Sequence, residues 1–171
     1  MPYWLDWIKR DSRFPLPAQV KKGLMSEEEA KNALASGADP IRLSVEKWDR
    51  IVNIMDSIAA QPLPLLYMHD FIEYMGFRTC AMCMDSISKY KSSKGKIQYG
   101  SDKCKVCPLA AIDQCTKKGS TYDQIEELML LPSLDVPHEI ETERMTQIAF
   151  LCRKMKANQE GMQKLEDDSA Q

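Results

Sequence analysis

The segment SVEKWDRIVNIMDSIAA, residues 44–60, decides the fold class of this chain. Its apolar side chains recur at intervals of three and four, which places them on one face of an α-helix. They are Val45, Trp48, Ile51, Val52, Met55 and Ile58. Ser44 is available as the N-cap residue, and Pro62 and Pro64 end the helix. The apolar face predicts a helix in the core rather than a cofactor site.

Helical signals continue on both sides of residues 44–60. SEEE at residues 26–29 has the form of a capping box, and Gly or Pro stands where several apolar segments end. The shorter helices predicted from these patterns cover residues 27–36, 65–75, 85–91 and 122–131. The chain is therefore expected to be mainly α-helical.

A long C-terminal helix is predicted over residues 138–165. Its apolar seam consists of Met145, Ile148, Cys152, Met155, Gln159 and Met162. The seam spans fewer than three heptads, which is short for a coiled coil, so packing within the chain is favoured. Phe150 lies off this seam, and a homodimer through the helix stays an alternative. Cys152 is expected to be a small buried hydrophobe.

Two CxxC pairs interrupt the helical pattern. They are Cys80-x2-Cys83 and Cys104-x2-Cys107, separated by twenty residues. This spacing is typical of structural zinc, because two residues between thiols let both sulfurs reach one tetrahedral ion. A closed four-thiolate site has no open position for water, so its expected role is architectural. Pro108 is suited to the first position of a helix, which would place Cys107 at a helix N-terminus.

The surroundings of the two pairs predict a small treble-clef-like zinc subregion, with a short strand over residues 96–99. An iron–sulfur cluster is an alternative, as is redox chemistry of a CxxC motif. Cys115 is a reserve ligand, a reactive thiol or a semi-buried thiol. His69 is expected to be a core histidine, although a Cys3His site is conceivable.

Positive charge gathers on the cysteine segment. Residues 78–118 hold nine Lys or Arg against three Asp, a charge of +6, so the rest of the chain carries −8 to reach the net −2. The lysines either neutralise an anionic metal centre or form a phosphate-binding face. The candidate nucleic-acid contacts are Lys89, Lys91, Lys94, Lys96, Lys103 and Lys105.

The 171 residues are expected to pack as one domain with three parts: 1–77, the cysteine segment 78–121, and 122–171. Trp4, Trp7 and Ile8 have helical spacing and either dock on the core or anchor a partner. No apolar stretch is long enough to cross a bilayer, and no export signal is visible. An intracellular, cytoplasmic location with reduced thiols is therefore expected.

Catalytic motifs are missing from the sequence: it has no Walker loop, GxSxG elbow, HExxH or GxGxxG. The function expected from a closed metal site is that of a non-enzymatic, zinc-stabilised adaptor that binds another protein. The first alternative is a nucleic-acid-binding module that uses the basic cysteine segment. The second is an iron–sulfur or redox protein.

The cysteine pairs occur together with other short motifs. These are Leu43-Ser44-Val45-Glu46-Lys47-Trp48, Cys80-x2-Cys83, Cys104-x2-Cys107-Pro108, and Cys115 followed by Thr121-Tyr122. Across about residues 40–125, the combination resembles an uncharacterised group of small proteins found mainly in phages and microbial viruses. That group has no agreed activity. The resemblance implies the ligands Cys80, Cys83, Cys104, Cys107 and Cys115.

Overall fold

The computed structural model of the chain describes residues 15–62, 64–94, 104, 106–132 and 135–170. Within those residues every regular element is a helix, so the prediction of a mainly α fold is confirmed. The elements are α2 (Ala18–Gly23), α3 (Glu27–Ala35), α4 (Pro40–Ala59), η1 (Pro64–Tyr67), α5 (Met68–Met75), η2 (Phe77–Thr79), α6 (Ala81–Lys94), α7 (Ala110–Asp113), α8 (Thr121–Leu130) and α9 (His138–Ser169).

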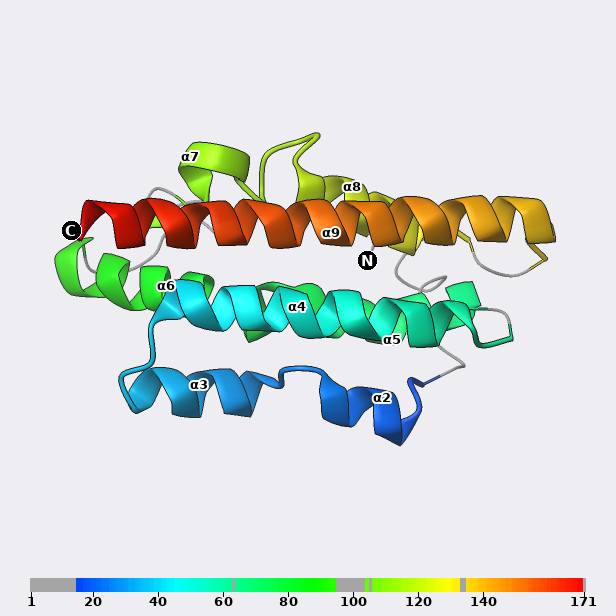
Figure 1. Ribbon diagram of the computed structural model, residues 1–171, viewed down its shortest axis with the longest axis horizontal. Helices are drawn as coiled ribbons and strands as arrows, with labels where there is room; N and C mark the ends of the chain where they lie inside the picture. The colour runs from blue at the N-terminus through cyan, green and yellow to red at the C-terminus, as the bar shows by residue number, and fades with distance from the viewer. Residues whose placement is uncertain (1–14, 63, 95–103, 105, 133–134, 171) are drawn as a thin grey trace.

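The helices form layers around the long helix α9. Figure 1 shows α9 running the length of the molecule, with α4 beside it in the opposite direction. α2 and α3 lie on the far side of α4, whereas α7 and α8 lie against α9. At about 1.5 Å per residue, α9 is about 48 Å long, and the other helices are arranged along it.

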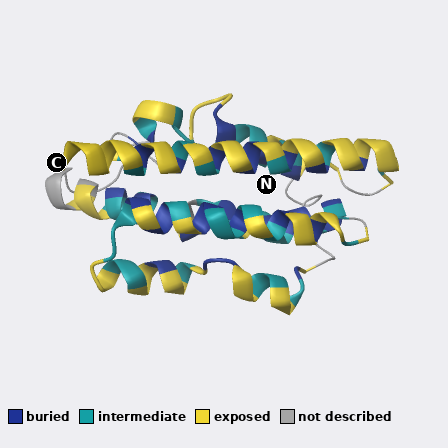
Figure 2. Ribbon diagram, viewed as in Figure 1, coloured by how far each residue is buried: buried dark blue, intermediate teal, exposed yellow. Residues whose placement is uncertain are grey.

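The core lies mainly between α4 and α9, the two helices that pack most extensively against each other. Trp48, Ile51 and Met55 of α4 are buried there with Ile148 and Cys152 of α9. All six residues of the predicted α9 seam are buried, which confirms packing within the chain. Figure 2 shows α9 alternating between buried and exposed colours, as expected of a helix with one covered face.

α4 begins four residues before the predicted start. Its N-cap is Asp39, whose Oδ1 accepts the N–H of Arg42 at 2.7 Å, and Pro40 occupies the first turn. Proline suits that position because its missing N–H would have no partner there. Ser44 is instead a fully buried residue inside the helix, so the prediction of Ser44 as the N-cap was wrong.

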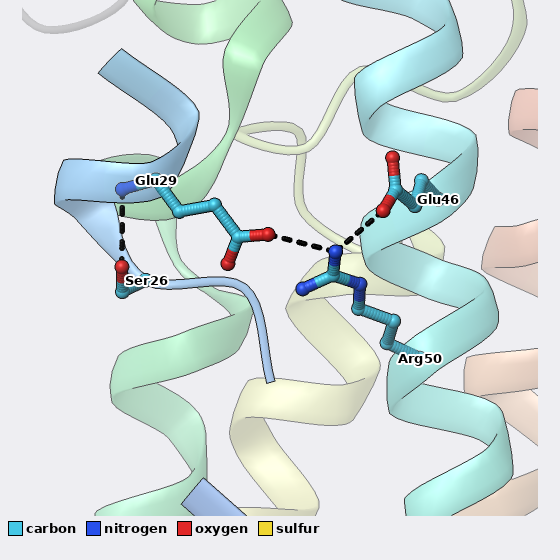
Figure 3. A network of polar contacts seen from close by, with 4 residues as sticks. All are labelled: Ser26, Glu29, Glu46 and Arg50. Carbon is cyan, nitrogen blue, oxygen red and sulfur yellow. Dashed lines mark hydrogen bonds and ion pairs between the residues drawn. The ribbon is translucent and has the colours of Figure 1, made fainter. Parts of the chain in front are cut away.

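The capping box predicted at residues 26–29 forms in part. Ser26 Oγ accepts the N–H of Glu29 at 3.1 Å and caps α3. The Glu29 carboxylate reaches Arg50 on α4, 2.7 Å away, and Arg50 also contacts Glu46 (Figure 3). The glutamate therefore ties α3 to α4 through an ion pair between two helices.

Two helix boundaries bear on the cysteines. α6 starts at Ala81 rather than at residue 85, so Cys80 immediately precedes this helix and Cys83 lies in its first turn. α7 has only four residues and starts at Ala110, three positions after Cys107. Pro108 thus precedes the N-cap residue Leu109, so the prediction of Pro108 at the first helical position was wrong, and Cys107 lies two residues before the N-cap.

The remaining boundaries lie close to the predictions. α3 and α8 agree with the predicted ranges to within one residue, whereas residues 65–75 divide into η1 and α5. α9 continues past Gly161 to Ser169. The predicted strand over residues 96–99 and the aromatic cluster of Trp4 and Trp7 lie outside the described residues. Among the described helices, none is long and apolar enough to span a membrane.

Candidate functional site

The structure brings together the cysteines that were predicted to bind metal. Cys80 immediately precedes α6, and Cys83 lies in the first turn of that helix. Cys104 and Cys107 precede α7, and Cys115 follows it. The fold thus brings the two CxxC pairs, which twenty residues separate in the sequence, to the same cavity.

A cavity of about 390 Å³ connects these cysteines to the core. Four thiols line it, those of Cys80, Cys83, Cys104 and Cys115, together with Lys47 of α4. Cys107 lies close by, because its thiol interacts electrostatically with Cys80 and Cys104. All five predicted ligands thus belong to one cluster, which we call the cysteine cluster.

The thiols converge without closing around an ion. Among the residues that the structure describes, no three His, Cys, Asp or Glu side chains form a group that could hold a metal. The donor chemistry nevertheless fits zinc, since four thiolates are the commonest structural ligand set for this ion. The sulfurs must draw together to bind it, and zinc stays a prediction.

Lys47 is the feature of the cluster that sequence reasoning missed. Its side chain is only 1% exposed. The ammonium Nζ donates to the carbonyls of Met75 and Gly76, at 2.7 and 3.0 Å, where α5 ends. Burial lowers the pKa of Lys47, while nearby cysteine thiolates raise it. A signal was present: Lys47 falls four residues before Ile51, on the apolar face of α4.

Cys80 is the thiol whose surroundings favour the anion. The side-chain hydrogen bond from Cys83 lowers its pKa from 9.0 to about 5, helped by the charge of Lys47. The backbone N–H groups of Met82 and Cys83 also bond to it, which makes Cys80 a thiolate cap for α6. Reactive and metal-binding cysteines share such electropositive surroundings.

The thiols of the second half of the cluster have the opposite tendency. Burial raises the pKa of Cys115 to about 12, and the nearby Cys80 and Cys107 thiols raise it further. Burial also raises the pKa of Cys107. Without a metal, the cluster therefore favours one thiolate, on Cys80, over several.

Polar contacts connect the second half of the cluster to α8 and α9. Both carboxylate oxygens of Asp113 accept the N–H of Thr121, at 3.1 and 3.2 Å, at the first residue of α8. Asn158 Nδ2 of α9 donates to the same carboxylate at 2.8 Å. Ser120 Oγ donates to the carbonyl of Cys115 at 3.0 Å. The cysteine segment therefore fixes where α8 begins.

Only part of the predicted nucleic-acid face can be placed. Lys89 lies on α6 in an ion pair with Asp85, at 2.7 Å, and Lys91 is exposed on the same helix. The side chain of Lys94, and Lys96, Lys103 and Lys105 altogether, lie outside the described residues. His69 is buried on α5, as predicted for a core histidine.

A second candidate site is an open apolar groove of about 1130 Å³ between α8 and α9. Phe150 of α9 is 64% exposed in this groove, and Leu130 and Leu131 at the end of α8 are also exposed. The α8–α9 groove is lined by Gln124, Glu127, Leu128, Leu130, Leu131, Thr146, Gln147, Phe150 and Leu151. Its lining residues on α8 recur at intervals of three and four, so one face of that helix is uncovered.

Comparisons with protein-family models, curated proteins and solved structures found no significant match to this chain. The resemblance of its cysteine pattern to the group of phage and viral proteins stays a prediction. The function must be inferred from the side chains themselves.

Proposed function

We propose that this protein is a non-enzymatic, zinc-stabilised adaptor that holds an amphipathic helix of another protein in the α8–α9 groove. The observation that carries the proposal is the exposure of Phe150 within an apolar concavity between two helices. Aromatic side chains in such grooves are frequent anchors of protein interfaces.

The charge of α8 indicates which helices would fit. Asp123, Glu126 and Glu127 lie on this helix, which contains no Lys or Arg, and Glu127 lines the groove itself. Complementary charge favours the correct partner and speeds the encounter. The proposed partner therefore presents apolar residues at positions i, i+3 or i+4, and i+7, with Lys or Arg beside them.

The role proposed for zinc is to hold the groove in shape. The ion would be bound by four thiolates, Cys80, Cys83, Cys104 and Cys107, with Cys115 in reserve. A closed thiolate site of this kind stabilises a fold and supplies no reactive water. Because Ser120, the N-cap residue of α8, donates a hydrogen bond to the carbonyl of Cys115, holding the cysteine segment in place would also hold one wall of the groove.

The adaptor is tested with a panel of synthetic helical peptides that share one apolar face and differ in flanking charge. Binding to the zinc-loaded full chain is measured by fluorescence anisotropy. Lys-flanked peptides are expected to bind more tightly than Glu-flanked ones. Phe150→Asp should weaken binding at least about 30-fold, the loss expected when an interface anchor worth about 2 kcal/mol is removed.

Leu165→Asp is the matched control for Phe150→Asp. Leu165 is similarly exposed, at 61%, on the same helix, but it does not line the groove. Binding by this variant should equal that of the wild type. The proposed groove would be contradicted if Phe150→Asp bound the peptides as tightly as the wild type, or if no peptide bound at all. A dimer in sedimentation analysis that Phe150→Asp dissociates would identify a second copy of the chain as the occupant instead.

The zinc centre has its own test. Elemental analysis of the purified chain should give one Zn²⁺ per molecule, and Cys80→Ser should lose it. The Cys115→Ser variant then decides whether this residue is a ligand. An iron–sulfur cluster, the second alternative, would give brown protein with visible absorbance after anaerobic purification.

Nucleic-acid binding by the basic cysteine segment is the first alternative. It predicts affinity for DNA or RNA that falls steeply with salt and falls again when Lys89, Lys91, Lys94 and Lys96 are neutralised. Binding that is indifferent to both changes would exclude it. The same assay run with Phe150→Asp separates this surface from the groove.

A further inference from the structure

We infer that Lys47 is the buried countercharge of the cysteine cluster and tunes it for a dianionic four-thiolate metal centre. This inference rests on the zinc centre proposed above. It assigns a role to a charged residue that lies on a different element from every cysteine in the cluster.

The position of Lys47 is unusual for a lysine. The side chain is 1% exposed, although lysine is almost never fully buried unless it is paired. An ammonium has three N–H donors, and the carbonyls of Met75 and Gly76 accept two hydrogen bonds from Nζ. Carbonyl oxygens solvate a cation but do not neutralise it, so the buried charge still favours an anion nearby.

The groups in the cavity that favour a positive charge on Lys47 are cysteines, of which Cys80 is the one that favours the thiolate. The electrostatic interactions that favour its charged form come from Cys80, Cys83 and Cys115. Asp123 and Glu126 of α8 line the same cavity, and the Asp123 carboxylate accepts the N–H of Gly119 at 2.7 Å. Lys47 thus lines the same cavity as cysteines from both CxxC pairs.

A bound metal ion would increase the negative charge that Lys47 offsets. Zn²⁺ with four thiolates carries a formal charge of −2, and burying that charge beside the core is unfavourable without compensation. The ammonium of Lys47 offsets one of the two charges. Residues outside the ligand set that act in this way typically change metal affinity about 10- to 100-fold when they are removed.

A purely structural role for Lys47 is the competing explanation. Its bonds to Met75 and Gly76 place a cation at the C-terminal end of α5, which stabilises a helix by itself. This role would affect the stability of the fold but would leave the intrinsic metal affinity of folded protein unchanged. The test must therefore read the metal centre directly.

The experiment compares Zn²⁺ affinities of the full chain by competition with a chromophoric chelator. Lys47→Met removes the charge and keeps most of the length of the side chain, whereas Lys47→Gln removes the charge but keeps an N–H donor. Both should bind Zn²⁺ about 10- to 100-fold more weakly than the wild type. Lys31→Met, which removes an exposed lysine paired with Glu27 on α3, should bind as the wild type does.

Co²⁺ substitution gives a second readout. A positive charge beside the sulfurs stabilises their lone pairs, so its removal should shift the thiolate-to-cobalt absorption bands to lower energy. Folded Lys47→Met and Lys47→Gln with wild-type affinity and unshifted bands would overturn the inference and leave the zinc centre standing. The inference also fails if both variants do not fold at saturating Zn²⁺, because Lys47 then serves the fold. A wild-type chain that binds neither ion overturns the metal centre together with its countercharge.

Discussion

At the scale of single residues, Cys80 couples the cluster to pH. Its pKa is about 5 in the folded chain and 9.0 as an ordinary thiol, so folding favours the thiolate. A lowered pKa stabilises the fold fully above pH 9, and this contribution is lost as the pH falls toward 5. In metal-free protein, the free energy of unfolding contributed by Cys80 should fall by on the order of 1 kcal/mol per pH unit across that range.

Urea unfolding of metal-free wild type and Cys80→Ser between pH 9 and 5 measures this contribution. The difference between the two proteins should shrink as the pH falls. Cys152→Ala is the control, because burial raises the pKa of Cys152 to about 12 and keeps this thiol neutral throughout the range. A constant difference between wild type and Cys80→Ser would show that Cys80 is not a thiolate in the metal-free fold.

The residues of the cluster were predictable to different degrees. The spacing of the CxxC pairs identifies Cys80, Cys83, Cys104 and Cys107 from the sequence alone, because two intervening residues have a known geometric meaning. The only sequence signal for Lys47 is its place on the apolar face of α4, and a lysine within an amphipathic helix is ordinarily exposed. Its burial depends on where α5 ends and where the cysteines lie, which are consequences of the tertiary fold.

At the scale of elements, the two ends of α4 offer a matched pair of carboxylates. Asp39 accepts the N–H of Arg42 and caps the N-terminus, where a negative charge is favourable. Asp56 lies in the last turn, exposed and 3.7 Å from Arg153. Asp39→Ala should lower the free energy of unfolding by about 1 kcal/mol. Asp56→Ala should change it by less than about 0.5 kcal/mol.

Chemical denaturation of both variants, each with Zn²⁺ in the buffer, gives the two free energies of unfolding. The prediction fails if Asp39→Ala unfolds at the same denaturant concentration as Asp56→Ala. The comparison removes the general effect of losing one negative charge, since both variants lose it from the same helix.

Periodicity predicted the existence of helices better than their ends. α9 was predicted from the three-and-four spacing of its seam, and all of that seam is buried. The start of α4 was misplaced because Ser44 and Asp39 are both acceptable caps, and Pro40 decides between them. α6 was predicted too short because its mixed surface gives little periodicity, and its first turn is fixed by Cys80 and the neighbouring helices.

At the scale of the molecule, the cysteine cluster lies between two helices, α6 and α8, that pack against different parts of the fold. α6 packs against α4, whereas α8 packs against α9 and α5. Cys80 and Cys83 open α6, and Cys115 leads through Ser120 into α8. A metal bound between them would connect the two helix pairs across the cavity. It should slow local opening most in the segment that has few buried apolar contacts.

That segment is residues 104–131, and hydrogen exchange tests whether it depends on the proposed metal. α7 has four residues and none of them is buried, whereas α4 and α9 supply most of the core. Local openings occur where buried apolar contacts are few. Chelation of Zn²⁺ should therefore speed amide exchange in the described parts of residues 104–131 by at least about tenfold, while α4 around Ile51 and α9 around Ile148 change little.

Asp113→Asn in protein with Zn²⁺ should reproduce part of this effect at α8 alone, because it weakens the contact to Thr121 and leaves the cysteines intact. Uniform acceleration across α4, α8 and α9 would mean that the metal stabilises the whole domain instead of the wall of the groove.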